Sequence, residues 1–234
     1  QPAEPSPEGL RASARRVGEP VSGACQVTEA AHRGTTADGA EAYEAVCASG
    51  PGYILIGQTP PTGGDCLLLA GSAVIQRERD PAVSIGTQCS LPTNLDHLGF
   101  LRAFAREAGV ACEVNEGMAV SLNRYDIGCD GQGYWIEKAE TGWVVTPCLT
   151  VKYDGRTCRF TTEEELNGVW RAALAGSPAA DCPVADSRRM GVDANGNTVY
   201  ELKCTEQTGF IVRLTPRQTL AAATACADAA HIAG

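Results

Sequence analysis

Tyr43-Glu-Ala-Val-Cys47, with Gly52-Tyr-Ile-Leu-Ile56 after it, is the most informative part of the sequence because its pattern occurs three times. The other two copies are Tyr125-Asp-Ile-Gly-Cys129 with Gly133-Tyr-Trp-Ile136, and Tyr200-Glu-Leu-Lys-Cys204 with Gly209-Phe-Ile-Val212. Short runs of apolar and β-branched residues, separated by glycine-containing turns, indicate antiparallel strands. Elements that return in the same order and spacing predict a repeat architecture.

Each copy is flanked by further repeated elements. A Cys-x-Val motif, or Cys-Pro-Val in the third copy, begins at Cys25, Cys112 and Cys182. Asp38-Gly39 and Asn195-Gly196 supply the positive φ angles that a tight hairpin turn requires. We therefore expect about three short antiparallel strands in each repeat.

An amphipathic helix is expected before each group of strands. Thr162-Glu-Glu-Glu165 has the pattern of a capping box and opens one helix. Residues 10–17 occupy the corresponding place before the first copy. Thr93 is the expected N-cap of the remaining helix, with Asp96 at N3. The apolar face of that helix is predicted to comprise Leu95, Leu98, Leu101 and Phe104.

These elements predict an α+β fold of three pseudo-repeats, each an amphipathic helix plus about three short antiparallel strands, stapled by disulfides. We expect a proline-rich extended lead-in at residues 1–8 and repeats at residues 9–88, 89–157 and 158–234. Repeat one includes an insertion at residues 70–88, whose charges indicate a surface loop. Because one repeat has only a small core, we expect the three to pack as one compact unit.

Eleven cysteines are spread singly along the chain, and none forms a Cys-x-x-Cys pair. This spacing argues against zinc ribbons, thioredoxin-type sites and haem attachment, so we predict no metal and no cofactor. Many separated cysteines are typical of secreted proteins. The first residue, Gln1, is what removal of a signal peptide would leave, and we expect a periplasmic or extracellular location.

Two disulfide connectivities agree with the repeat. The first joins Cys25 to Cys47, Cys66 to Cys89, Cys112 to Cys129, Cys148 to Cys158 and Cys182 to Cys204. The second joins Cys47 to Cys66, Cys89 to Cys112, Cys129 to Cys148, Cys158 to Cys182 and Cys204 to Cys226. It links opposite ends of a helix about 20 Å long, whereas bridged Cα atoms lie within about 7 Å. Only tight returns at both helix ends would permit the second, and we favour the first.

The favoured pairing leaves Cys226 without a partner. By analogy with Cys148 and Cys158, the cysteine equivalent to its partner would fall just beyond Gly234. We expect the natural polypeptide to continue and to include a twelfth cysteine. The alternative is a free Cys226 that pairs with another chain.

Composition excludes several classes of protein. Hydrophobic residues make up 44% and charged residues 20% of the chain, which is typical of a globular protein and not of a disordered one. A formal net charge of −9 opposes binding to nucleic acid, which requires clustered Lys and Arg. No apolar run approaches the roughly 18 to 20 residues that span a bilayer, so we predict a chain that does not span a membrane.

An acid follows the tyrosine in every copy: Glu44, Asp126 and Glu201. Because successive side chains of a strand point to opposite faces, we expect Tyr and Cys to point inward and the acids outward, in a structural role. A ring of acids that binds a cation is one alternative, and a hydrolase that uses Glu44 or Glu201 is another. His32, His97 and His231 have no neighbours at metal-ligand spacing, and we assign them no function.

Repeat two alone carries Tyr134, Trp135 and Trp143 on one hairpin. Such aromatic side chains stack on sugar rings or anchor protein partners. The other interpretation is that they fill the core of this repeat, whose first loop is shorter. We predict no catalytic residue elsewhere, because the motifs of hydrolases, phosphate loops and dinucleotide sites are absent from the sequence.

The recurring Tyr-Glu-x-x-Cys and Gly-Tyr elements, with Cys-x-Val before them and Cys-x-Leu/Phe-x-Thr opening a helix, span Cys25 to Cys226. This pattern resembles uncharacterised cysteine-rich repeat proteins that Gram-negative bacteria secrete to the periplasm or the exterior. The resemblance implies a location and an architecture but no activity. Threefold repetition without an asymmetric polar cluster favours a non-enzymatic structural or accessory subunit of a larger envelope or extracellular assembly, with protein partners. The alternative is a carbohydrate-binding module that uses the aromatic hairpin.

Overall fold

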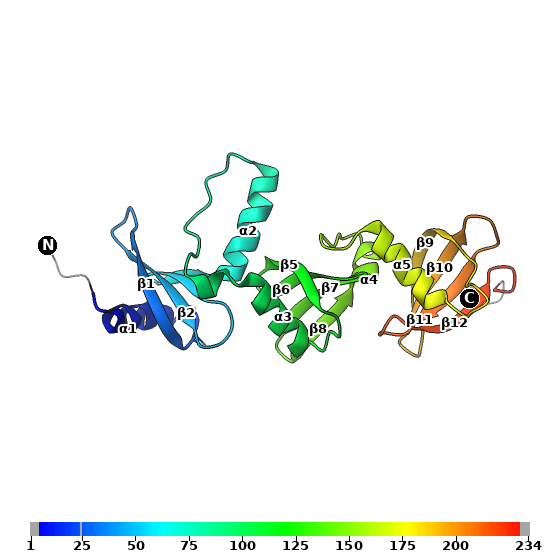
Figure 1. Ribbon diagram of the computed structural model, residues 1–234, viewed down its shortest axis with the longest axis horizontal. Coiled ribbons are helices and arrows are strands. Elements are labelled where there is room, and N and C mark those ends of the chain that lie inside the picture. The colour runs from blue at the N-terminus through cyan, green and yellow to red at the C-terminus, as the bar shows by residue number, and fades with distance from the viewer. Residues whose placement is uncertain (1–4, 24, 230–234) are drawn as a thin grey trace. The chain divides into compact units, whose positions relative to one another are not determined.

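The computed structural model describes residues 5–23 and 25–229. Its fold is α+β, with three four-stranded sheets (Figure 1). Neighbouring strands in each sheet are consecutive in the chain, the arrangement that short turns between antiparallel strands produce. The chain divides into two compact units: residues 1–127 with 136–145, and residues 128–135 with 146–234.

The first sheet consists of β1 (Val27–Thr35), β2 (Glu41–Cys47), β3 (Tyr53–Ile56) and β4 (Thr62–Asp65). The hairpin expected at Asp38-Gly39 is confirmed, because Gly39 has a φ of 80° between β1 and β2. In β2, Glu44 pairs with Ala31 of β1 and with Ile54 of β3. One face of the sheet packs against α1 (Pro7–Gly18), and this core contains Ala14, Val17, Val27, Ala45 and Leu55.

α1 begins earlier than the sequence predicts. Ser6 is its N-cap, and the Ser6 hydroxyl accepts a hydrogen bond of 3.2 Å from the Gly9 N–H. Pro7 occupies a first-turn position, where its missing N–H costs no helical hydrogen bond. The predicted lead-in of residues 1–8 is therefore wrong at its last two residues, and residues 1–4 lie outside the described part of the chain.

Most of the insertion in repeat one is a helix and not a surface loop. α2 covers Cys66–Arg79, and the irregular segment begins only after it. The Asp65 carboxylate caps the helix by accepting a 2.7 Å hydrogen bond from the Leu68 N–H. Leucine and alanine favour helix here, and the basic residues of its last turn suit the helix dipole. The loop predicted at residues 70–88 is thus wrong for residues 70–79.

The second sheet consists of β5 (Val114–Ser121), β6 (Arg124–Cys129), β7 (Gln132–Ala139) and β8 (Gly142–Pro147). Both α2 and α3 (His97–Glu107) pack against β5. At the contact with α2, a Cβ added to Gly71 would lie 2.1 Å from the Ala119 carbonyl oxygen. Glycine at this position therefore lets the helix approach the strand at backbone distance.

The N-cap of α3 is Asp96, not Thr93, and its carboxylate accepts a 3.0 Å hydrogen bond from the Gly99 N–H. Pro92 instead begins a 3-10 helix, η1 (Pro92–Leu95). Thr93 lies inside that turn, and Leu95 is outside α3 with 52% of its surface exposed. Leu101 and Phe104 are buried as predicted.

The third sheet consists of β9 (Val184–Val192), β10 (Thr198–Cys204), β11 (Phe210–Leu214) and β12 (Leu220–Ala225). α4 (Cys148–Tyr153) and α5 (Glu163–Leu174) precede it. The capping box at Thr162 and Glu165 is confirmed. Gly196, with a φ of 80°, confirms the other predicted hairpin turn. The core of this part includes Leu166, Trp170, Tyr200, Leu202, Phe210, Val212 and Leu214.

Each sheet has a fourth strand where the sequence predicts about three. In the first sheet it is β4, which contains Gly63 and Gly64, and in the third it is the alanine-rich β12. Glycine and alanine have low strand propensity, so neither segment gives a strand signal. They become strands because β3 and β11 offer the unpaired backbone groups with which they pair.

Disulfides join Cys25 to Cys47, Cys66 to Cys89, Cys148 to Cys158 and Cys182 to Cys204. Cys112 and Cys129 are also disulfide-bonded, and Cys226 is free. The four joined pairs are those of the first connectivity. A chain with this many disulfides is typical of an oxidising, non-cytoplasmic compartment. None of the helices in residues 5–23 and 25–229 is long and apolar enough to cross a bilayer.

Candidate functional site

The acid of the first sheet points into a covered face. Glu44 is fully buried, which contradicts the expectation of an outward carboxylate. Its neighbours on the same face of β2, Ala42 and Val46, are buried too. The face opposite α1 is therefore a second buried layer, and the segment that covers it begins at Cys89, far along the chain.

Two backbone N–H groups and two side chains of that segment donate to the Glu44 carboxylate. The Ser90 N–H lies 2.9 and 3.0 Å from the two oxygens, and the Leu91 N–H lies 2.8 Å from one of them. The Ser90 hydroxyl donates at 3.1 Å and the Asn94 amide at 2.9 Å. Arg33 adds a cationic group, with its Nε 3.7 Å from the carboxylate. Glu44 thus anchors the stretch from Ser90 to Asn94, which ends in the 3-10 helix η1.

Hydrogen bonding decides the protonation of this buried group. Burial raises the pKa of Glu44. The hydrogen bonds from Asn94, Leu91 and Ser90 together lower the pKa by more than burial raises it, so the pKa of Glu44 lies below its ordinary value of 4.5. The carboxylate is therefore ionised at neutral pH. Asn94 also donates to the Ala45 carbonyl at 3.2 Å, which ties the segment to the strand beside the acid.

The buried carboxylate is not a metal site. A Glu44 oxygen and the sulfurs of Cys66 and Cys89 lie within 4.8 Å of one another. The two sulfurs are bonded to each other, so neither is a thiolate that could bind a metal. Because the carboxylate is fully buried and already accepts these donors, it offers no oxygen to a substrate.

The other two acids differ from each other. Asp126 is fully buried, so the outward position predicted for it is also wrong. Glu201 alone is partly exposed, with 42% of its side chain accessible. Its carboxylate accepts two hydrogen bonds from the Arg188 guanidinium, at 3.1 and 2.7 Å. The three acids belong to three different sheets, and Glu201 lies in the other compact unit from Glu44 and Asp126.

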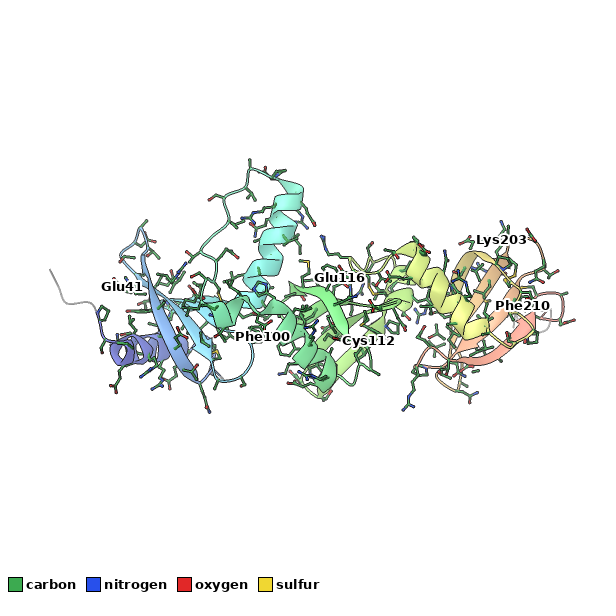
Figure 2. All side chains as sticks on the ribbon, in the orientation of Figure 1. Glu41, Phe100, Cys112, Glu116, Lys203 and Phe210 are labelled. Atoms are coloured by element: carbon green, nitrogen blue, oxygen red, sulfur yellow. A yellow bond between two sulfur atoms is a disulfide. The ribbon has the colours of Figure 1, made fainter. Side chains whose placement is uncertain are left out.

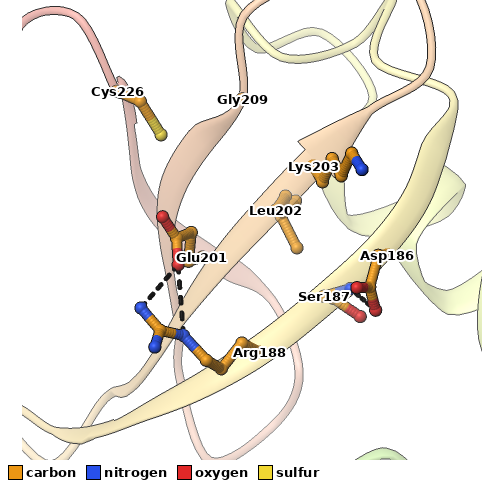
Figure 3. Close-up of a pocket in the computed structure, with 8 residues that line it drawn as sticks. All are labelled: Asp186, Ser187, Arg188, Glu201, Leu202, Lys203, Gly209 and Cys226. Carbon is orange, nitrogen blue, oxygen red and sulfur yellow. Dashed lines mark hydrogen bonds and ion pairs between the residues drawn. The ribbon is translucent and has the colours of Figure 1, made fainter.

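An open pocket of about 380 Å³ surrounds Glu201 (Figure 3). Lys203 follows on the same face of β10, and its exposed side chain is visible in Figure 2. The lining is completed by Asp186, Ser187, Arg188, Leu202, Gly209 and Cys226. In the third sheet, the face that carries the acid is therefore open, whereas in the first sheet it is covered.

Cys226 lies at the rim of this pocket as a free, partly buried thiol. Burial raises the pKa of Cys226, and the negative charge of Glu201 raises it further. At neutral pH the group is thus a thiol and reacts slowly with small disulfides, because the thiolate is the nucleophile.

The three aromatic residues predicted to form one surface lie in different surroundings. Trp143 packs against Phe104 and Tyr125, with ring centroids 5.4 and 6.2 Å away. Tyr134 and Trp135 are adjacent in β7, so their side chains point to opposite faces. Trp143 lies in the compact unit formed by residues 1–127 with 136–145, whereas Tyr134 and Trp135 lie in the other unit.

Two of the three histidines are in the described part of the chain. His32 pairs with Glu41 on the first sheet. His97 is at the start of α3, where burial lowers its pKa. His231 lies outside the described residues.

Comparison with protein-family models, with curated proteins and with solved structures found no match to this chain. The site is therefore defined by its own geometry. Sequence reasoning identified Glu44, Glu201 and Cys226 but missed Ser90, Leu91 and Asn94, the residues that cover Glu44. One signal in the sequence could have indicated this covering: Ala42 and Val46, which share a face of the strand with Glu44, are apolar. Apolar residues on both faces of a strand indicate a sheet that is buried on both faces.

Proposed function

We propose that this chain is a non-enzymatic, extracytoplasmic structural or accessory subunit of a larger assembly, which it joins through the open face of its third sheet. The disulfides support an oxidising compartment, periplasmic or extracellular. The open face supports a protein partner, because the equivalent face of the first sheet is covered by polypeptide.

The observation that carries this proposal is the contrast between two equivalent acids. Glu44 is fully buried beneath the segment that starts at Cys89, whereas 42% of the Glu201 side chain is accessible. The surroundings of Glu201 also differ in character, since the exposed Lys203 takes the place of the buried Val46. A polar, charged face of this kind suits an interface that forms after folding, because it remains soluble while it is uncovered.

The experiment compares complexes formed by three forms of the protein, isolated without reductant from cells that naturally make it. Wild type is expected in a complex of fixed stoichiometry, and Glu201→Arg is expected to lose it because a cation replaces the acceptor beside Arg188. Arg171→Glu, an exposed position on α5, is the control and should retain the complex. A wild-type protein recovered alone, or a complex unaffected by Glu201→Arg, would contradict the proposal.

A further inference from the structure

The surroundings of Glu44 and Glu201 share one backbone framework. Cys66 follows β4 and its N–H donates to the Gly52 carbonyl at 2.8 Å. Cys226 follows β12 and its N–H donates to the Gly209 carbonyl at 2.9 Å. The first and third sheets therefore present a cysteine at the same place relative to the glycine that immediately precedes the third strand, β3 or β11.

The two glycines are also placed alike against the second strand. A Cβ added to Gly52 would lie 2.2 Å from the Ala45 oxygen, and one added to Gly209 would lie 2.2 Å from the Leu202 oxygen. Ala45 and Leu202 each follow the acid of their own strand. Acid, glycine and cysteine thus form the same constellation in both sheets.

In the first sheet this constellation holds an extended segment at two points. Cys89 bonds to Cys66, with Cα atoms 5.6 Å apart, and the next two residues donate their backbone N–H groups to Glu44. Asn94 closes the contact and lies against Gly52, where an added Cβ would be 2.1 Å from its Oδ1. The segment is recognised by its cysteine and by backbone groups that any residue except proline possesses.

Within residues 5–23 and 25–229, no segment occupies the two corresponding anchor points of the third sheet. Cys226 is a free thiol at the pocket, and Glu201 faces the opening with Arg188 as its ion-pair partner (Figure 3). The ten other cysteines of the chain are all disulfide-bonded. A segment that pairs with Cys226 must therefore come from outside residues 1–234. Two sources were expected from the sequence, a continuation of this polypeptide and another chain. We favour another chain, because the exposed Lys203 stands where the first sheet has the buried Val46, and a charged face stays soluble until a separate partner covers it.

We propose that the pocket around Glu201 and Cys226 binds an extended segment of a partner polypeptide in which a cysteine is followed by two residues with free backbone N–H groups, as in Cys89-Ser90-Leu91. The cysteine pairs with Cys226, and the two N–H groups donate to Glu201. This inference rests on the proposed function and names the kind of partner that the subunit binds.

The covalent step is a thiol–disulfide exchange. The Cys226 thiolate attacks the sulfur of the partner's cysteine, which arrives as a mixed disulfide with a small thiol. A new S–S bond forms to Cys226 while the bond to the small thiol breaks. The small thiol leaves as a thiolate and takes up the proton that Cys226 released, so that one disulfide replaces another without net oxidation.

The test uses a peptide with the sequence of residues 89–95, its cysteine held as a mixed disulfide with thionitrobenzoate. Release of the coloured thiolate gives the rate, and intact mass gives the adduct. The control peptide carries N-methyl groups on the two amides after the cysteine, which removes both donors and leaves the reacting disulfide unchanged. Each hydrogen bond from a peptide N–H to the Glu201 carboxylate stabilises the docked peptide. We therefore expect the unmodified peptide to react at least about tenfold faster than the N-methylated control. Equal rates for the two peptides would overturn the proposal.

Variants separate docking from the charge effect of Glu201. Glu201→Gln removes a negative charge that raises the pKa of Cys226, so it should speed the reaction with oxidised glutathione. The same variant should reduce the preference for the unmodified peptide to about twofold or less, because a neutral acceptor is weaker. Cys226→Ser should form no adduct. If the preference survives in Glu201→Gln, the assignment of Glu201 as the acceptor is wrong.

The inference and the proposed function can fail separately. A complex that persists in both Cys226→Ser and Glu201→Gln would overturn this binding mode while leaving the subunit proposal standing. A wild-type protein that reacts selectively with the peptide and yet is isolated alone would overturn the subunit proposal. If Cys226 is instead bonded to a cysteine of its own longer polypeptide, the proposal that the bound segment belongs to a partner polypeptide is wrong.

Discussion

Replacing Glu44 with glutamine tests whether a buried carboxylate holds the segment after Cys89 on the first sheet. Glutamine keeps the shape of the side chain but replaces one carboxylate oxygen with an NH2 group. That NH2 group would face hydrogen-bond donors of Ser90 and Leu91, which lie 2.8 to 3.1 Å from the carboxylate in the wild type. Loss of charge-assisted hydrogen bonds, with an N–H left unpaired, costs about 2–4 kcal/mol. The matched variant is Glu201→Gln, whose partly exposed ion pair contributes at most about 1 kcal/mol.

Hydrogen exchange at the Ser90 and Leu91 amides is the appropriate assay, because a protein of two compact units need not unfold in one transition. At tenfold per 1.4 kcal/mol, Glu44→Gln should speed exchange of these amides from about thirtyfold to several hundredfold. Amides of α5, in the other unit, should be unaffected. An increase below about twofold, equal to that in Glu201→Gln, would refute the anchoring role of Glu44.

Three further predictions concern stability. The fold lowers the pKa of Glu44 below 4.5, so the stabilisation that its carboxylate provides is complete above the unfolded-state pKa and is lost as the pH falls through the folded-state pKa. The exchange rates of the Ser90 amide in wild type and in Glu44→Gln, each corrected for the intrinsic rate, should therefore become equal at acid pH. Gly52→Ala should destabilise the first sheet severely in thermal unfolding, because its Cβ would lie 2.1 Å from Asn94, whereas Gly86→Ala meets no atom within 4 Å and should be nearly neutral. Thr162→Ala should cost about 1 kcal/mol in denaturant unfolding through loss of the capping box, and an unchanged midpoint would contradict that role.

Local patterns were sufficient to predict much of the fold. The turn at Asp38-Gly39 and the capping box at Thr162 depend on residues close in sequence, and the structure contains both. Alternation along the strands correctly placed Tyr200 and Cys204 in the core. These features follow from the conformational preferences and hydrogen bonds of a few neighbouring residues.

Long-range contacts account for what the sequence did not reveal. Glu44 is buried because residues 46 and 47 positions later in the chain lie over it, a contact that no local pattern encodes. β12 is a strand because β11 provides its pairing partner, although its alanines favour helix. The open face at Glu201 has a sequence signal, since Lys203 stands where Val46 stands in the first repeat.

The most direct test of the account is the bonding state of Cys226 in the natural complex. Free thiols are alkylated during isolation without reductant, and the peptide that contains Cys226 is then identified by mass spectrometry before and after reduction. We predict that this peptide is disulfide-linked to a cysteine peptide of a different polypeptide and is released by reductant. An alkylated Cys226 in the intact complex, or a bond to a cysteine of its own chain, would contradict it.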